Sequence, residues 1–345
     1  MALQLDGIAD LAKAVLDEPH RGEWTNLGTD LQDHPAATML LREKSVKVSG
    51  GTAVKVRFAN GTSGAARNVG MYSIDNVNQA DRMVEGSVPW RHTETSYTWD
   101  LHEFDANMGT FEVYNLIEER IDDGDVDMVK LIESDFWGRP TSSTDTVTPF
   151  GLGYWLVYNA TEGFNGADQT GFAAGPAGID SGTYTRWKNY TAQYTNISKT
   201  DLVRKMRKAA YKVNFKAPRP SPGGNLNPRF GYYTNYDVEE QFSEILEGQN
   251  QNLGFALDPM DGKVVFRSNP VVVVSQLDAN ADDPVCGIDW DVFQFMVLRG
   301  WNMRKSQRVA PDQHNVVRAW TDLSYNTRCS NRRGLFLIAK GDPWT

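Results

Sequence analysis

The chain has 345 residues, of which 40% are hydrophobic and 11% aromatic, and its formal net charge is −9. This composition is that of a globular protein and excludes a disordered chain. The length exceeds the roughly 250–300 residues at which single hydrophobic cores stop growing, so we expect more than one domain. The acidic balance argues against a protein whose main task is to grip nucleic acid, although an acidic shell can still enclose it.

Signals for secretion and membrane insertion are not found. The start of the chain lacks a basic segment followed by an apolar run, so no signal peptide is expected. No window approaches the roughly 18 consecutive apolar residues of a membrane span. Cys286 and Cys329 stand outside any CxxC pattern, which predicts two reduced, buried thiols in an intracellular protein.

The first two segments predict parts that cannot form a core alone. Residues 1–45 combine a weak helical pattern with a polar stretch and end in an apolar anchor, Pro35–Leu41, which is typical of an arm lying on another surface. Residues 46–105 predict a long two-stranded hairpin, with an outgoing strand to Phe58 and a return strand over Val88–Leu101. A hairpin this long with few apolar residues is only marginally stable, so we expect it to need a partner outside the subunit.

A long acidic helix is predicted over residues 110–137. Its apolar residues recur every four positions, Thr110 or Asn107 is expected to cap its start, and Gly138 and Pro140 are expected to end it. The run Asp122–Asp125 predicts a kink or a shift of register. Two interpretations of its nine carboxylates stay open, a solvated helix face or a surface for a basic partner.

Short strands and ordered loops are predicted over residues 139–198, followed by a basic helix over 199–216. Asp201 or Thr200 is expected to cap this helix, and its outer face carries Lys199, Arg204, Lys205, Arg207, Lys208, Lys212 and Lys216. This face is interpreted as solvated, as a phosphate contact, or as a match for acidic surface in the same or a neighbouring subunit. A helix over Asp237–Glu247, strands within 263–275 and 293–298, and two or three antiparallel strands in the tail complete an α+β chain.

No catalytic, cofactor or metal signature is present. The sequence has no GxSxG, HExxH, P-loop or GxGxxG, and its five histidines show no ligand-like spacing. Carboxylate pairs such as Asp282-Asp283 stand in turns without an apolar pocket that would raise a pKa. We therefore predict no catalytic residue, no cofactor and no metal ligand.

One segment is distinctive. Gly178-Ile179-Asp180, Thr183-Tyr184, Trp187 and Asn189 match the Gly-Ile-Asp-Arg-x-Thr-Tyr-x-x-Trp-Arg-Asn box of many tailed-bacteriophage major capsid proteins, with Ser181 and Lys188 as departures. The order of other pieces is similar too, with Trp90-Arg91 opening the return strand, Asn107-Met108-Gly109 before the long helix, and a terminal segment, Tyr325–Gly334, that resembles the closing strand pair. The resemblance covers residues 35–340.

The resemblance implies the Hong-Kong-ninety-seven-type capsid fold. Its parts would be an N-terminal arm (1–45), an E-loop with flanking strands (46–105), a P-domain (106–198) with a spine helix (110–137), an axial A-domain (199–312) and P-domain return strands (313–345). The residues that the resemblance marks for assembly are Trp90, Arg91, Gly178, Ile179, Asp180, Tyr184, Trp187, Asn189, Arg332 and Arg333.

The implied function is a major capsid protein without catalytic activity, located in the virion and assembled in the host cytoplasm. It would form hexamers and pentamers of an icosahedral shell that encloses double-stranded DNA without sequence-specific binding, with portal, scaffolding and decoration proteins as further partners. Two alternatives stay open, an encapsulin-type compartment shell and a β-rich enzyme or carbohydrate-binding module. Some such shells join subunits by Lys–Asn isopeptide bonds; Lys44, Lys47, Asn60 and Asn68 are in flexible places here, but no spacing identifies a pair.

Overall fold

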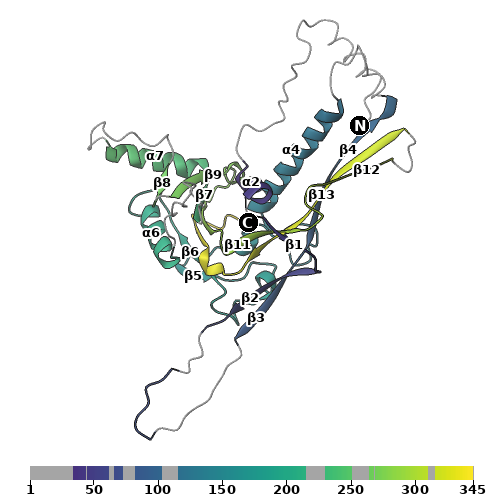
Figure 1. The fold of residues 1–345 in the computed structure, drawn as a ribbon. Helices are drawn as coiled ribbons and strands as arrows, with labels where there is room; N and C mark the ends of the chain where they lie inside the picture. Colours follow the sequence, from purple (N-terminus) through teal and green to yellow (C-terminus); the bar gives the residue numbers. More distant parts are fainter. Residues whose placement is uncertain are drawn as a thin grey trace, which may run out of the picture. The chain divides into compact units, whose positions relative to one another are not determined.

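The computed structural model describes residues 34–43, 45–61, 66–72, 82–102, 116–214, 230–250, 264–267, 269–309 and 315–344. These residues form the helices and strands labelled in Figure 1. They divide into two compact units. Unit 1 takes described residues of 93–130 and 303–323, and unit 2 takes the rest. Three elements pass from one unit to the other: β4 (Arg91–Asp100), α4 (Leu116–Trp137) and β13 (Val316–Cys329). Residues 1–33 of the predicted arm and the predicted caps of the long helix lie outside the described ranges.

Unit 1 joins the first part of α4 to strands of a five-stranded sheet. In that sheet β12 (Arg304–Val309) and β4 both pair with β13. Gly124 lets the helix approach β4, because a Cβ at this position would lie 3.2 Å from Cδ1 of Tyr97. Lys305 Nζ then reaches Asp125 Oδ2 at 3.0 Å. α4 runs without interruption through Asp122–Asp125, where Gly124 serves close packing, and the kink or register shift expected there stays a prediction.

Unit 2 is organised around a seven-stranded mixed sheet. In spatial order its strands are β5 (Gly163–Gly166), β6 (Asn189–Gln193), β14 (Phe336–Ala339), β10 (Val285–Asp289), β7 (Phe230–Thr234), β9 (Asn269–Val273) and β8 (Val265–Phe266). The helices α6 (Leu202–Lys212) and α7 (Tyr236–Asn250) pack on it. One hydrophobic cluster contains buried residues of both helices and of five of these strands.

Two strands of unit 2, β1 (Ser45–Val48) and β11 (Phe293–Leu298), belong to the five-stranded sheet that also contains β13, β12 and β4. There β1 runs parallel to β11, and β11 is antiparallel to the last part of β13. The predicted apolar anchor forms α2 (Pro35–Thr38) and a π turn over Met39–Glu43. A buried carboxylate of α4 fixes it, because Glu133 accepts hydrogen bonds from the Ala37 amide at 2.9 Å and from Trp137 Nε1 at 2.6 Å. Burial raises the pKa of Glu133.

The predicted hairpin is shorter than expected and has different partners. Its paired strands are β2 (Ala53–Ala59) and β3 (Met83–Pro89), with Ala53 opposite Pro89. The return strand was expected to begin at Val88 and run to Leu101, but β4 belongs to the sheet of β13. In β3 the inward positions are Val84, Gly86 and Val88, so a glycine interrupts the apolar alternation and hides the strand from a periodicity argument.

Other predicted elements are confirmed or corrected in detail. The long helix ends at Trp137, before Gly138, and both cysteines are buried and free. The basic helix covers Leu202–Lys212 rather than 199–216. Asp201 does not cap it through its side chain, because its carboxylate accepts hydrogen bonds from the amides of Thr195 and Asn196. The tail strands β13 and β14 lie in different sheets, and β14 is parallel to β6, so the antiparallel tail is wrong.

The smaller elements are the helix α5 (Leu152–Trp155) and 3-10 turns at Pro176–Gly178, Ser275–Leu277 and Arg332–Gly334. Among the helices that the structure describes, none is both long enough and apolar enough to cross a membrane.

Gly86 gives a test of how the hairpin strand β3 packs against Ala177 and Ile179. A Cβ at this position would lie 2.6 Å from the Ala177 carbonyl oxygen and 2.6 Å from Cδ1 of Ile179. We expect Gly86→Ala to lower the free energy of unfolding by about 1–3 kcal/mol, because the backbone must shift. Gly70→Ala is the matched control, since a Cβ there meets nothing within 4 Å. Chemical denaturation measures both, and equal stability of the two variants would contradict the packing described.

Candidate assembly site

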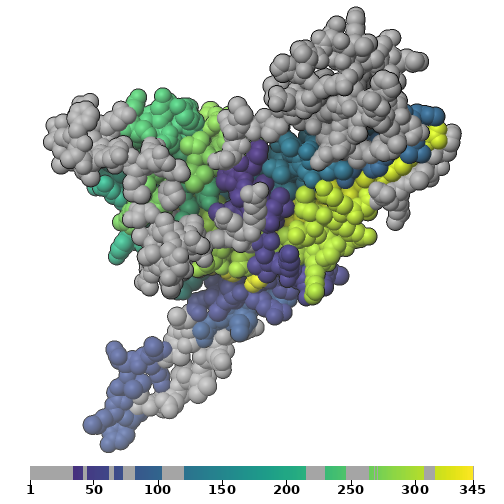
Figure 2. All heavy atoms as spheres, turned by 45° about the horizontal axis from the view of Figure 1, so that its top comes forward, coloured from purple at the N-terminus to yellow at the C-terminus, as the bar shows by residue number. Residues whose placement is uncertain are grey.

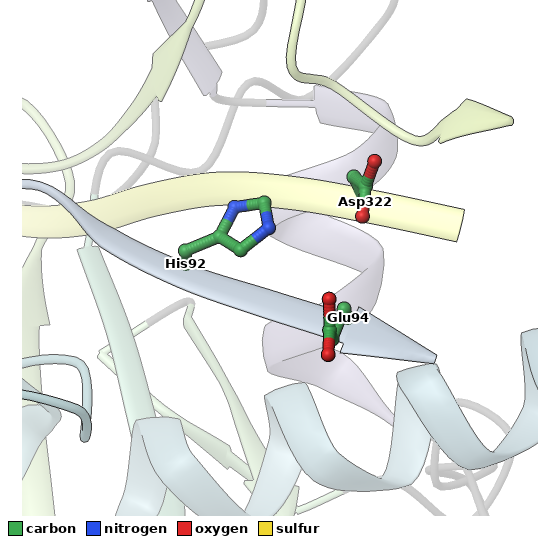
Figure 3. A group of neighbouring side chains, drawn as sticks. All are labelled: His92, Glu94 and Asp322. Carbon is green, nitrogen blue, oxygen red and sulfur yellow. The ribbon is translucent and has the colours of Figure 1, made fainter. Parts of the chain in front are cut away.

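Among the residues that the structure describes, one group of possible metal-ligating side chains contains a histidine and two carboxylates. Figure 3 shows His92 and Glu94, which lie two residues apart on β4, and Asp322 of β13. The ring of His92 has partners within unit 2. Its Nδ1 lies 2.8 Å from Ser324 Oγ. It also makes an edge-to-face contact with the ring of Trp301, and the two ring centroids are 5.2 Å apart. Acidic side chains on exposed strands are common without an ion. We therefore assign no catalytic or metal-binding role to this group.

The Gly178–Asn189 segment, called the box below, begins with a turn that its own aspartate organises. Asp180 accepts hydrogen bonds from the Gly182 amide at 2.8 Å and from the amide and hydroxyl of Thr183, at 3.1 and 2.6 Å. These bonds hold the pKa of Asp180 below its usual value. Gly178 precedes the turn at φ 73°, a left-handed conformation that favours glycine. The Gly-Ile-Asp-x-x-Thr spacing is thus that of a self-capped turn.

Residues in the box pack against the paired strands β2 and β3 of the hairpin. Trp187 is 2% exposed, and its ring stacks on Phe58 of β2 with centroids 4.5 Å apart and planes 6° apart. Its Nε1 donates to the Pro176 carbonyl at 3.2 Å. Ile179, also 2% exposed, lies against the inward glycine of β3. The box is therefore the seat on which the base of β2–β3 packs.

The end of the box is tied to the C-terminal segment by a buried arginine. Arg332 is fully buried, and its guanidinium donates to the carbonyls of Trp155 at 2.9 Å, Trp187 at 2.8 Å and Ala167 at 2.8 Å. It also donates to Asn189 Oδ1 at 3.0 Å. Burial lowers the pKa of Arg332 to about 10, so it still carries its proton at neutral pH.

Asn189 and Arg332 together form a buried hydrogen-bonded cluster, called the node below. Its Oδ1 also accepts a hydrogen bond from the Val157 amide at 3.1 Å, and its Nδ2 donates to the Val157 carbonyl at 3.0 Å. Gly166 makes room for it, because a Cβ there would lie 2.1 Å from Asn189 Oδ1. A side-chain amide can satisfy a backbone N–H and C=O at once, which explains an asparagine at the end of the box.

Trp90 and Arg91 join the hairpin base to the loop before α5. Trp90 Nε1 donates to the Gly51 carbonyl at 2.8 Å, across the start of β2. The Arg91 guanidinium lies 5.5 Å from the Phe150 ring centroid and donates to the carbonyls of Asp145, at 2.8 Å, and Thr146. These two side chains fix how β3 continues into β4.

The structure brings most of the predicted assembly residues together inside unit 2. Ile179, Trp187, Asn189 and Arg332 are buried, while Gly178 is exposed. Tyr184 is half-buried, and Arg333 is also half-buried with its guanidinium 4.2 Å from the Phe164 ring centroid. Their assembly role stays a prediction, and the contacts observed are those of a scaffold that holds the hairpin.

Sequence reasoning missed Phe58, Gly86 and Glu133 as partners of this scaffold. Phe58 was identified only as a strand residue, and nothing in one sequence indicates which ring it meets. Glu133 was counted among the acidic residues of a solvated face, yet it is 0% exposed. Its position between Ile132 and Phe136, on the apolar side of the helix, was the available signal.

The adjacent arginines allow a matched test of the node. Arg332→Lys loses the fork that reaches several carbonyls at once, so we expect the free energy of unfolding to fall by about 3–5 kcal/mol. Arg333→Lys should cost less than about 1 kcal/mol, because its guanidinium is half-buried against one ring. Chemical denaturation compares them, and equal losses would argue against the node.

Asp135 of α4 gives a pH-dependent prediction. Burial, with a contribution from Asp145, raises its pKa from 3.8 to about 6. The folded state therefore binds this proton more tightly than the unfolded state, and that contribution to stability is lost as the pH rises from about 4 to about 6. We expect Asp135→Asn to stabilise the protein by about 1 kcal/mol at neutral pH, after discounting for partial exposure, and to give no gain near pH 4.

Unfolding midpoints measured across this pH range check the prediction. Asp122→Asn, an exposed position on the same helix, is the control. A gain from Asp135→Asn that is the same at both ends of the range would rule out titration as its cause.

Comparison with known proteins identifies the fold. No family model matches the chain, and no curated protein matches its sequence. Among solved structures, the capsid of cyanophage A-1(L) is similar with a TM-score of 0.64 and 13% identity, over 93% of this chain and 96% of that chain. The capsid protein of a native GTA particle is similar with a TM-score of 0.57 and 10% identity, over 97% and 99%.

An encapsulin is similar as well. The encapsulin of the holo-SrpI complex from Synechococcus elongatus has a TM-score of 0.52 and 10% identity, over 100% of this chain and 98% of that chain. These neighbours are capsid and shell proteins rather than enzymes. The chain therefore has the mixed helix-and-strand fold of phage capsid proteins.

Proposed function

We propose that the chain is the major capsid protein of a tailed bacteriophage, located in the virion capsid. It self-assembles into hexamers and pentamers of an icosahedral shell that encloses double-stranded DNA. The observation that carries this proposal is the likeness to phage capsid structures over nearly the whole chain. Portal, scaffolding and decoration proteins are the further partners, and assembly takes place in the host cytoplasm.

The parts of the fold take the following roles. The hairpin β2–β3 with the segment between its strands is the E-loop, α4 is the spine helix of the P-domain, and the sheet region with α6 and α7 is the A-domain that meets its copies at the symmetry axes. β13 and β14 return the chain to the P-domain. This is the Hong-Kong-ninety-seven-type arrangement.

The hairpin supports a role in assembly. One face of β2–β3 is buried through Val54, Val56 and Val88. Beyond the paired strands, Met71 and Tyr72 are 93% and 100% exposed, and Met83 at the start of β3 is 84% exposed. Large apolar side chains exposed together mark an interaction surface. A neighbouring subunit supplies the cover, as part of an obligate interface on the order of 2,000 Å² or more.

An encapsulin-type compartment is the second candidate, because an encapsulin has the same fold. The two candidates differ in cargo, which is DNA in the phage capsid and a protein in the compartment. Isopeptide crosslinks between subunits remain untested; Lys47 and Asn68 are exposed, and Lys44 lies outside the described residues.

The test of the proposed function is assembly of the purified protein, followed by electron microscopy and sedimentation. We expect closed polyhedral shells, and nuclease treatment with mass spectrometry then identifies the cargo. A monomer that stays monodisperse across salt and pH would overturn the proposal.

The hairpin's role has its own test. Deleting residues 61–78 should leave a folded, soluble subunit that forms no closed shells, because β2 and β3 still pair while their extension is lost. Replacing Val69, Met71 and Tyr72 by serine is the length-matched variant and should also reduce shell yield. Normal particles from the deletion would remove the role assigned to the hairpin.

A further inference from the structure

The helix α6 carries a stripe of positive charge on its outer face. Its exposed residues are Arg204, Arg207, Lys208, Tyr211 and Lys212. Counted from Arg204 they stand at positions i, i+3, i+4, i+7 and i+8, so they share one side of the helix. Tyr211 is 76% exposed in the middle of this cationic stripe.

The helix α7 carries a stripe of the opposite sign. Asp237, Glu240 and Glu244 are exposed and spaced at intervals of three and four. Tyr236, at the start of this acidic stripe, is 55% exposed. Figure 2 shows α7, in green, at the surface of the molecule.

Both stripes face outward from one core. The buried sides of the two helices, through Met206 of α6 and Phe242 of α7, belong to the same hydrophobic cluster. The helices are thus held in one unit, and their charged side chains are exposed while their apolar side chains belong to that cluster.

The stripes do not neutralise each other within the subunit. In α6, Lys205 pairs with Asp201 at 2.5 Å and Lys208 with Glu162 at 2.6 Å. Over the described ranges, no carboxylate lies within ion-pair distance of Arg204, Arg207 or Lys212. The same ranges contain no cation at that distance from the three carboxylates of the acidic stripe.

Ordinary solvation does not explain this separation of charge. A solvated helix gains from alternating signs four residues apart, and like charges at that spacing destabilise it. Here Arg204, Lys208 and Lys212 follow one another at that spacing on α6, and Glu240 and Glu244 do so on α7. Each helix bears a repulsion that contact with the opposite stripe would relieve.

We propose that the cationic stripe of one copy binds the acidic stripe of a second copy of this chain. The contact joins two different surfaces, so it is head-to-tail and can be repeated around an axis to close a ring. The exposed tyrosines beside each stripe fit such a contact, since tyrosine is enriched at protein interfaces. This inference rests on the proposed function and names the contact that joins neighbouring A-domains.

Charge reversal tests the pairing. The α6 variant carries Arg204→Glu, Arg207→Glu and Lys212→Glu, and the α7 variant carries Asp237→Lys, Glu240→Lys and Glu244→Lys. Each variant alone faces like charges across the contact and should lose closed particles in electron microscopy and sedimentation. The variant with all six changes regains complementary stripes and the wild-type net charge, and it should assemble again.

A mixture of the two single-helix variants separates complementarity from net charge. In a ring of alternating copies every contact joins opposite stripes, so the mixture should form six-membered rings, while five-membered rings cannot alternate. Unfolding midpoints close to that of the wild type establish that each variant is folded; the six-change variant serves if one of them is not.

The outcomes separate this inference from the proposed function. Failure of the wild-type protein to form particles overturns the proposed function. Wild-type particles together with normal particles from both single-helix variants overturn only the stripe pairing. Normal α6-variant particles that package less DNA would overturn it too, and would assign the cationic stripe to phosphates.

Discussion

The buried guanidinium of Arg332 is the contact on which the rest of the larger unit depends. It joins segments that are far apart in sequence, since its donors reach carbonyls near α5, beside β5 and at the end of the box. A buried charge without such partners would cost several kcal/mol, so these carbonyls must stay where they are for the chain to fold. An arginine suits this position because its planar fork serves several acceptors at once, which a lysine cannot do.

The box connects this node to the hairpin. One end of the box is fixed by Asn189 and Arg332, and its other end closes on itself through Asp180. Between them Trp187 presents its ring to Phe58 of β2. The hairpin has few apolar residues of its own, so its packing against the box fixes the direction in which β2 and β3 run from the box. The box contains many buried residues because it holds the hairpin in place, although the proposed function of the protein depends on its surface.

Periodicity predicted the elements that a single sequence can specify. The end of α4, the basic and acidic helices, and the strand over Phe293–Leu298 follow from spacing and breaker residues. It failed where glycine serves tertiary packing, since Gly86 at an inward position concealed the strand β3. It also could not assign strand partners, so the predicted return strand over Val88–Leu101 joined the end of β3 to β4, which pairs with a different strand. The box was recognisable as a motif, but the ring and the guanidinium that it meets depend on long-range contacts.

The self-assembly proposed for this acidic protein sets an electrostatic problem. Copies with a net charge of −9 repel one another at a distance, more strongly at low salt. Association then needs surfaces whose local charge differs from the average, together with apolar side chains left uncovered in the subunit. Charge complementarity contributes more to orientation and register than to affinity. The exposed Met71 and Tyr72 of the hairpin can contribute apolar contact, while in the proposed pairing the separated charge on α6 and α7 selects which edges of two copies meet. The orientation of two copies would then be set by the charged helices, and their affinity by apolar contacts elsewhere in the chain.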